Sequence, residues 1–181
     1  FRVCLLRFQK VMSLSKPVTS VAIMKLVEEG KLSLDDRVFG PGALLSIPFP
    51  ASNKYVSQIT VEHLLRHSAA PEWTNDANGP MFLQTQLSKK ALVLWVLKNR
   101  TLKHAPGSRY AYSNFAYCIL GLVIEKISGL SYENYVKQTI LLPAKANSFT
   151  VASDKRGASP LEVTYYPHGD WDPYNLPLRR M

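Results

Sequence analysis

The chain has 181 residues, of which 46% are hydrophobic and 19% are charged, and its formal net charge is +9. This composition is typical of one globular domain with a hydrophobic core and excludes an intrinsically disordered chain. Its longest apolar run, Phe115 to Ile124, is too short to span a bilayer, and its basic residues are scattered without interleaved aromatics, so we expect no membrane span and no nucleic-acid partner.

The first predicted element is a helix that begins at about Ser13 and ends at Gly30. Phe1 to Lys10 mixes apolar and basic residues, but no small-residue cleavage site precedes Ser13, so we expect an incomplete N-terminus rather than a targeting segment. From Pro17 to Glu29 apolar residues occur almost all round the helix, which predicts burial on most sides. Pro17 is tolerated only within the first turn. Ser13 is therefore predicted at the helix N-terminus, where backbone amides favour developing negative charge.

Further helices are predicted from their capping and terminating residues. They run from the cap Thr60 through His67, from the cap Ser88 through Asn99, from Phe115 to Ser128 before Gly129, and from the cap Ser131 to Pro143. Gly40-Pro41-Gly42 lacks the later glycine of a dinucleotide fingerprint and is predicted as a turn. Ala144 to Met181 is predicted as irregular structure with short strands. No repeat or linker divides the chain, so residues 1–181 are treated as one domain.

Ser13 and Lys16 form the first candidate for chemistry. Residues three apart share one face of a helix, so the Lys16 amine can reach the Ser13 hydroxyl. A serine hydroxyl becomes a good nucleophile when a neighbouring base takes its proton, and a lysine can act as that base. Taken alone, the same pair is also compatible with a helix cap beside a solvated lysine.

Tyr112-Ser113-Asn114 is the second candidate, in a loop just before the predicted helix at Phe115. A tyrosine acts as a base at neutral pH only if its pKa falls well below the usual value of about 10, and a neighbouring ammonium such as Lys16 favours that change. Asn114 could hold a substrate amide and also bind the lysine. The alternative is an aromatic packing residue followed by an asparagine cap.

The cysteines and histidines predict no further site. Cys4 and Cys118 are too far apart in the chain to define a disulfide framework, and Cys118 is expected to be a reduced thiol buried in a helix. His63 and His67 have the spacing of metal ligands on one helix face. A zinc-protease helix would carry Glu directly after the first histidine, where this chain has Leu64, so we expect no metal.

Together these segments resemble the β-lactamase-related serine hydrolases, which include class C β-lactamases, penicillin-binding D-alanyl-D-alanine peptidases and related esterases. Ser13-Leu14-Ser15-Lys16 is similar to the family's Ser-x-x-Lys motif, and Tyr112-Ser113-Asn114 is similar to its Tyr-x-Asn motif. The segments Leu26 to Asp36, Ile59 to His67, and Pro106 to Gly129 resemble other family blocks in order and spacing. The resemblance covers roughly residues 8 to 143.

The chain also departs from the family pattern. The family carries a third motif, Lys or His followed by a small residue and Gly, on a strand that donates one N–H to the oxyanion hole. Lys155-Arg156-Gly157 and His168-Gly169-Asp170 match it poorly and are predicted as turns, although the loop from His168 to Tyr174 could line a cleft. Ser68-Ala69-Ala70-Pro71 replaces the family's glycine-leucine step. We therefore expect part of a longer α/β protein with a β-lactamase/transpeptidase-like fold, in which the helical region dominates and much of the antiparallel sheet is missing.

The resemblance implies an acyl hydrolase without metal or organic cofactor. It assigns Ser13 as the nucleophile, Lys16 and Tyr112 as the groups that move protons, and Asn114 as a substrate-binding residue. The partner would be a small-molecule or peptide substrate with an ester, amide or lactam carbonyl. The alternative is a non-catalytic chain that retains the fold for binding. The sequence leaves the substrate, the compartment and the oligomeric state open.

Overall fold

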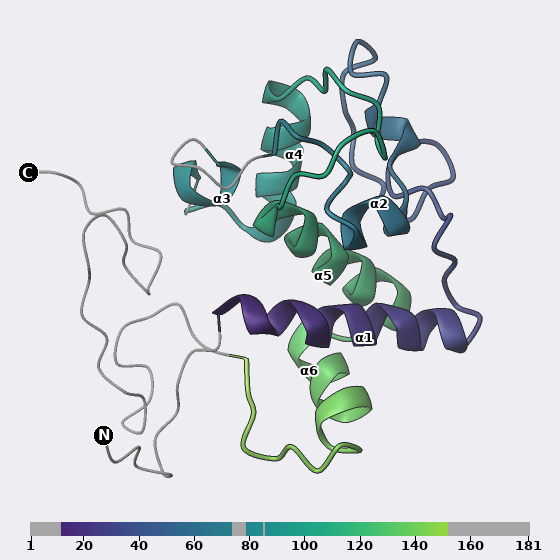
Figure 1. The fold of residues 1–181 in the computed structure, drawn as a ribbon, viewed down its shortest axis with the longest axis vertical. Helices are drawn as coiled ribbons and strands as arrows, with labels where there is room; N and C mark the ends of the chain where they lie inside the picture. Colours follow the sequence, from purple (N-terminus) through teal and green to yellow (C-terminus); the bar gives the residue numbers. More distant parts are fainter. Residues whose placement is uncertain (1–11, 74–78, 85, 152–181) are drawn as a thin grey trace, which may run out of the picture.

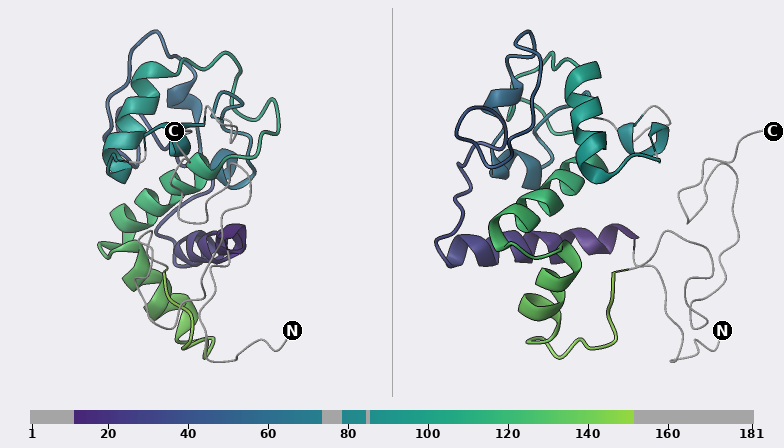
Figure 2. Two further views of the ribbon diagram at one scale, coloured as in Figure 1. Left: turned by 90° about the vertical axis from the view of Figure 1, so that its left-hand side faces the viewer. Right: turned by 180° about the vertical axis from the view of Figure 1, so that it is seen from behind.

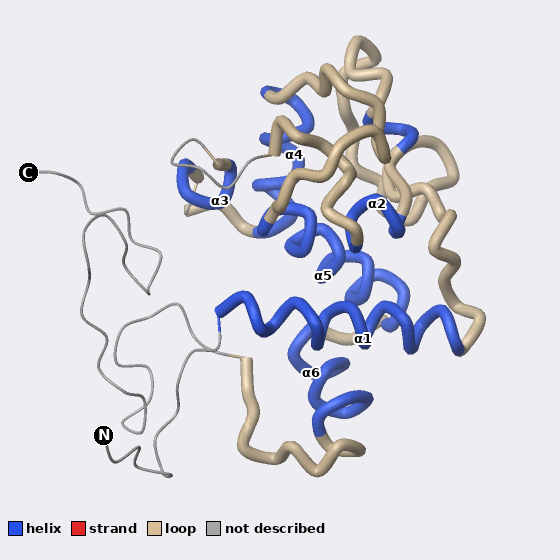
Figure 3. The backbone as a smooth tube through the Cα atoms, in the orientation of Figure 1, coloured by secondary structure: helices blue, strands red, loops and turns tan. Residues whose placement is uncertain are grey.

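The computed structural model describes residues 12–73, 79–84 and 86–151, and in these residues it consists of helices joined by long loops (Figure 1, Figure 3). No strand occurs among the described residues, where extended pairing is limited to the isolated bridges Arg37–Thr60 and Phe39–Leu45. The helices are η1 (Met12–Leu14), α1 (Ser15–Glu28), η2 (Val56–Gln58), α2 (Val61–Leu65), α3 (Pro80–Leu83), α4 (Lys89–Asn99), α5 (Asn114–Ser128), α6 (Tyr132–Val136) and the π-helical η3 (Lys137–Leu141).

Helix α1 confirms the predicted position of Pro17 and the predicted stop at Gly30. Pro17 lies in the first turn, where its missing N–H leaves no hydrogen bond unmade. Gly30 has a left-handed φ of 68°, and its N–H donates to the carbonyl of Val27. The predicted burial on most sides is wrong for one face, because Val21 and Met24 are 52% and 46% exposed.

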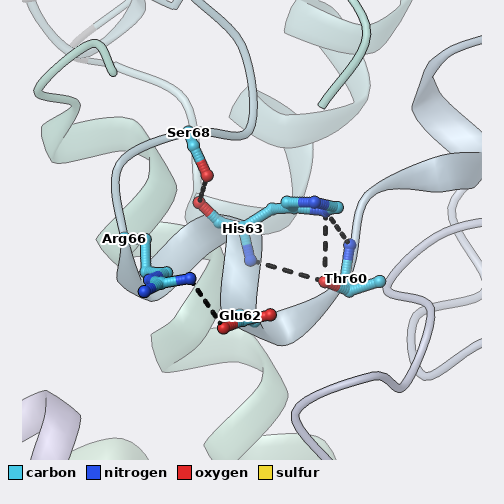
Figure 4. A network of polar contacts seen from close by, with 5 residues as sticks. All are labelled: Thr60, Glu62, His63, Arg66 and Ser68. Carbon is cyan, nitrogen blue, oxygen red and sulfur yellow. Dashed lines mark hydrogen bonds and ion pairs between the residues drawn. The ribbon is translucent and has the colours of Figure 1, made fainter. Parts of the chain in front are cut away.

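Helix α2 begins where the sequence predicts and ends earlier (Figure 4). The Thr60 hydroxyl accepts the N–H of His63, while the Thr60 N–H donates to Nδ1 of His63 at 3.2 Å, which forms a capping box. The helix stops at Leu65 rather than at His67, because His67 takes a left-handed φ of 56° that an α-helix does not allow.

The later helices follow the predicted caps. The hydroxyls of Ser88, Ser113 and Ser131 accept N–H groups at the starts of α4, α5 and α6, and Gly129 ends α5 with a left-handed φ of 72°. The cap of α5 is therefore Ser113, and Asn114 is the first helical residue rather than the cap. The helix predicted from Ser131 to Pro143 consists of α6 and the following η3, whose π geometry was not predicted, and helix α3 was not predicted.

Helix α5 is the centre of the core, where it contacts α1, α2, α3, α4 and α6. Its buried face includes Phe115, whose ring meets the fully buried Trp73 edge to face at 5.0 Å between centroids. Helix α1 crosses the molecule with α5 on one side and α6 on the other, and the view from behind shows the same order (Figure 1, Figure 2). This crossing brings the start of α1 close to the start of α5.

Two further expectations concern helix α5. Cys118 is a free thiol on α5 and is largely but not completely buried. No single helix in the described part of the chain is long and apolar enough to cross a membrane, although α5 and the α6–η3 pair would pass together by length and composition, with a bend of 77° between them.

Candidate active site

The structure brings all four sequence-predicted site residues together at the start of α1 and α5. Ser13 lies in η1 and Lys16 is the second residue of α1. Tyr112 lies in the loop before α5, and Asn114 is the first residue of α5. The contact between α1 and α5 therefore joins two motifs that are 99 residues apart in sequence.

Three short contacts define the geometry of this cluster. Tyr112 Oη donates to Ser13 Oγ at 2.8 Å, and Lys16 Nζ donates to Asn114 Oδ1 at 2.6 Å. Lys16 Nζ also lies 3.4 Å from Ser13 Oγ. The Ser13 hydroxyl thus has two groups within hydrogen-bond reach that can take or return its proton, and Asn114 holds one of them in place.

The Lys16 ammonium sets the electrostatics of the cluster. It lies 4.7 Å from the ring centroid of Tyr112 and 5.6 Å from that of Tyr117, which is cation–π geometry. Partial burial would raise the pKa of the Tyr112 phenol, but hydrogen bonds from Lys16 and Ser13 and the Lys16 charge outweigh it and lower that pKa from its usual value near 10. The phenolate is therefore easier to form here than in water.

Ser13 lies two residues before Ser15, the first residue of α1, and so close to the predicted N-terminus of the helix. The N-cap of α1 is Leu14, which has helical backbone angles and makes no side-chain cap. Ser13 belongs to the 3-10 turn η1 that precedes it, and its side chain is exposed. The hydroxyl is therefore open to a substrate approaching from solvent.

Two residues that the sequence reasoning did not assign to the site lie against it. Tyr117 on α5 faces Lys16, and its hydroxyl donates to the carbonyl of Leu65 at 3.2 Å. His67 contacts the ring of Tyr112, with centroids 4.5 Å apart, and its Nδ1 accepts the N–H of Ser113 at 3.1 Å. The sequence signal for Tyr117 was its spacing from Asn114, because residues three apart share one helix face.

The two histidines do not share a helix face as predicted. His63 Nδ1 accepts the N–H of Thr60, whereas His67 Nδ1 accepts the N–H of Ser113. The Nδ1 atoms of the two rings therefore accept hydrogen bonds from two different backbone segments. No group of three or more His, Cys, Asp or Glu side chains with metal-ligand geometry occurs in the described part of the chain.

Several sequence predictions fall outside the described residues. They concern Cys4, Lys155-Arg156-Gly157, the loop from His168 to Tyr174, and the irregular segment from Ala152 onward.

Comparison with known proteins places this chain in a family. The family model described as Beta-lactamase matches residues 9–181. The chain is 34% identical over 164 residues to penicillin-binding protein 4* of Bacillus subtilis, and the match covers 87% of this chain and 33% of that protein. The chain spans about a third of the length of the curated relatives it matches.

Solved structures give the same result. The octameric penicillin-binding protein homologue from Pyrococcus abyssi matches with a TM-score of 0.60 and 33% identity, over 75% of this chain and 31% of that one. A D-stereospecific amidohydrolase from Streptomyces sp. matches with a TM-score of 0.59 and 26% identity, over 76% and 42% of the two chains. The predicted β-lactamase/transpeptidase-like fold is thereby confirmed. Since the family model covers nearly the whole chain, this protein belongs to the Beta-lactamase family.

Proposed function

We propose that this chain carries the acyl-transfer centre of a serine hydrolase, with Ser13 as its nucleophile. The observation that carries the proposal is the position of Ser13 Oγ, 2.8 Å from Tyr112 Oη and 3.4 Å from Lys16 Nζ. A hydroxyl held between a phenol and an amine is the arrangement that nucleophilic catalysis requires. The family membership and the names of the relatives support the same reaction class.

In the proposed reaction, Tyr112 acts as the immediate base. The phenol first loses its proton to solvent, and the phenolate then takes the proton of Ser13 Oγ as that oxygen bonds to the substrate carbonyl carbon. The Lys16 ammonium stabilises the phenolate. The phenol then returns the proton to the leaving group as the tetrahedral intermediate collapses, which leaves an acyl group on Ser13. Water, deprotonated by the same phenolate, then attacks the acyl carbon. The bond between Ser13 Oγ and the acyl carbon breaks, the phenol returns the proton to Ser13 Oγ, and an acid leaves.

Lys16 and Asn114 act together in this scheme. The 2.6 Å bond from Lys16 to Asn114 fixes the ammonium beside the phenol, so the charge is in place before the proton moves. Asn114 is also proposed to bind the amide of the substrate. The Ser13 N–H is proposed as one oxyanion donor, and candidates for the second donor lie outside the described residues.

The proposed substrates are amides, including lactams, rather than carbonyl compounds in general. The reason is the set of names among the relatives, which include penicillin-binding proteins and an amidohydrolase. A non-catalytic binding role is the alternative, and the labelling experiment distinguishes the two.

The test is covalent labelling by a fluorescent fluorophosphonate, which reacts with activated serines. We expect the folded wild-type chain to be labelled, Ser13→Ala to abolish the label, and Ser15→Ala, two residues away in the same exposed stretch, to keep it. Tyr112→Phe should slow labelling about 100- to 10,000-fold, the usual contribution of a general base. A chain that is folded by circular dichroism and stays unlabelled would refute the proposal and favour the binding role, as would a label that survives in Ser13→Ala.

A further inference from the structure

His67 holds the loop of Tyr112 at two points. Its carbonyl accepts the N–H of Ala111 at 2.7 Å, and its ring Nδ1 accepts the N–H of Ser113 at 3.1 Å. Tyr112 is the residue between these two anchors. A single residue therefore fixes the backbone on both sides of the phenol that contacts Ser13.

The side chain of His67 also supports the phenol ring itself. Its imidazole lies 4.5 Å from the Tyr112 ring and 5.0 Å from the Tyr117 ring, in tilted geometry with angles of 38° and 33°. The Tyr110 ring meets it edge-on at 6.0 Å. Tyr112 and Tyr117 are the same two rings that face the Lys16 ammonium. The imidazole thus packs against the two tyrosine rings that lie beside the proposed catalytic lysine.

The backbone of His67 is in an unusual state that permits both contacts. Its φ of 56° lies in the left-handed region, which is uncommon for residues other than glycine, although histidine adopts it more often than most. Helix α2 ends at Leu65, and the left-handed turn after it leads directly into the contacts with Ala111 and Ser113. Strain of this kind persists when the surrounding contacts over-determine it, and it concentrates at functional sites.

We infer that His67 is a positioning residue for the proposed reaction, and that it holds Tyr112 against Ser13 only while its Nδ1 is unprotonated. This inference rests on the proposed function. An unprotonated Nδ1 accepts the Ser113 N–H, which places the ring proton on Nε2. Protonation of Nδ1 would set a donor against the Ser113 N–H and break that anchor.

The surroundings of His67 keep its ring neutral near pH 7. Partial burial and the positive charge of Lys16 both lower the pKa of His67 from its usual value of 6.5. The titratable groups that face the ring are Lys16 from α1, Tyr110 and Tyr112 from the loop, and Tyr117 from α5. The anchor is therefore intact at neutral pH and is lost as the pH falls below 6.5.

Two variants separate the acceptor from the ring. In His67→Asn, Oδ1 replaces Nδ1 at the same distance from Cγ, the side chain cannot be protonated, and asparagine tolerates a left-handed backbone. In His67→Phe, the ring remains and the acceptor is lost. The matched control is His63→Phe, since the His63 Nδ1 also accepts a backbone N–H, but from Thr60 at the start of α2 rather than from the Tyr112 loop.

The rate of fluorophosphonate labelling tests the inference. At pH 7.5 we expect His67→Phe to slow labelling about 10- to 100-fold, the effect of misplacing a reacting group by about 1 Å. His67→Asn should recover most of the rate that His67→Phe loses, and His63→Phe should stay close to the wild-type rate. The ratio of the wild-type rate to the His67→Asn rate should be constant above pH 7 and should decrease at pH values below the pKa of His67. The titration of Tyr112 affects both chains equally and therefore cancels in this ratio.

The amide of Ser113 gives a second readout that does not depend on activity. Its nitrogen and proton shifts in wild type should titrate with the His67 ring in NMR spectra, and this titration should disappear in His67→Asn. A wild-type chain that is not labelled would refute the proposed function. The NMR titration of the Ser113 amide would still test the hydrogen bond between its N–H and His67 Nδ1. A labelled wild type with a flat rate ratio, or a His67→Phe rate equal to that of His63→Phe, would overturn the positioning role.

Discussion

Gly107→Ala is the substitution whose energetic cost the structure defines most directly. Gly107 precedes the Tyr112 loop and has a φ of 83°, which L-residues with a side chain adopt at a cost of about 1–2 kcal/mol. A Cβ at this position would lie 3.0 Å from Nε2 and 3.4 Å from Cδ2 of His63. The His63 ring would have to move by a few tenths of an ångström.

The His63 ring resists this movement because the capping box of α2 holds it. Its Nδ1 accepts the Thr60 N–H at 3.2 Å and lies 3.1 Å from the Thr60 hydroxyl. Rotating the ring away from its preferred angle costs about 0.5–1.5 kcal/mol, and weakening the cap costs a similar amount. Together with the backbone cost, these terms lead us to expect that Gly107→Ala lowers the free energy of unfolding by about 2–5 kcal/mol, and the Tm by about 4–20 °C for a chain of this size.

Gly129→Ala is the matched control for the backbone cost. Gly129 has a φ of 72°, and no atom lies within 4 Å of the position that a Cβ would take there, so its substitution should cost only about 1–2 kcal/mol. Urea unfolding followed by far-ultraviolet circular dichroism measures both variants. A steric conflict with the His63 ring is refuted if Gly107→Ala lowers the unfolding free energy no more than Gly129→Ala does. It is also refuted if the loss caused by Gly107→Ala is unchanged when His63 is replaced by alanine as well.

Three further predictions concern groups away from Ser13. The buried side-chain amide of Asn53 makes three hydrogen bonds with backbone groups around the end of α4, two as donor and one as acceptor. Asn53→Ala removes all three and should lower the unfolding free energy by about 2–4 kcal/mol in urea titrations. Burial raises the pKa of Cys118 to about 11, so iodoacetamide at pH 8 should modify it at least tenfold more slowly in the folded than in the urea-unfolded chain, as measured by mass spectrometry. Burial lowers the pKa of both His63 and His67 below 6.5, so the unfolded state binds these protons more readily. The unfolding free energy should therefore decrease as the pH falls from 6.5 towards 5, and a gain in stability over that window would contradict the lowered pKa values of these histidines.

The helix starts could be predicted because their causes are local. A serine hydroxyl that accepts an N–H three residues later, as at Ser88 and Ser131, acts within one turn of the chain. Gly129 ends α5 for an equally local reason, its left-handed φ. The four residues of α3 are too few to show a helical period, which is why the pattern of apolar residues did not reveal this helix.

The end of α2 and the exposed face of α1 depend on contacts that a local pattern does not contain. The left-handed turn at His67 is stabilised by the segment from Ala111 to Ser113, more than forty residues later. The apolar residues Val21 and Met24 follow the helical period of a buried element but are exposed in the structure. Periodicity predicts that a face is apolar, and the tertiary arrangement decides whether that face is covered.

The start of α5 shows why the site could not be derived from spacing alone. The Ser113 hydroxyl caps the helix through the N–H of Ala116, while the Ser113 N–H is held by His67. The next residue, Asn114, binds Lys16, and the ring of Tyr117, one turn later, faces the same ammonium. One helix start thus orients groups towards α1, towards the end of α2 and along its own axis. Because the Tyr112 phenol and Ser13 come from segments 99 residues apart, the geometry at the serine depends on the packing of the helices and not on the Ser-x-x-Lys motif alone.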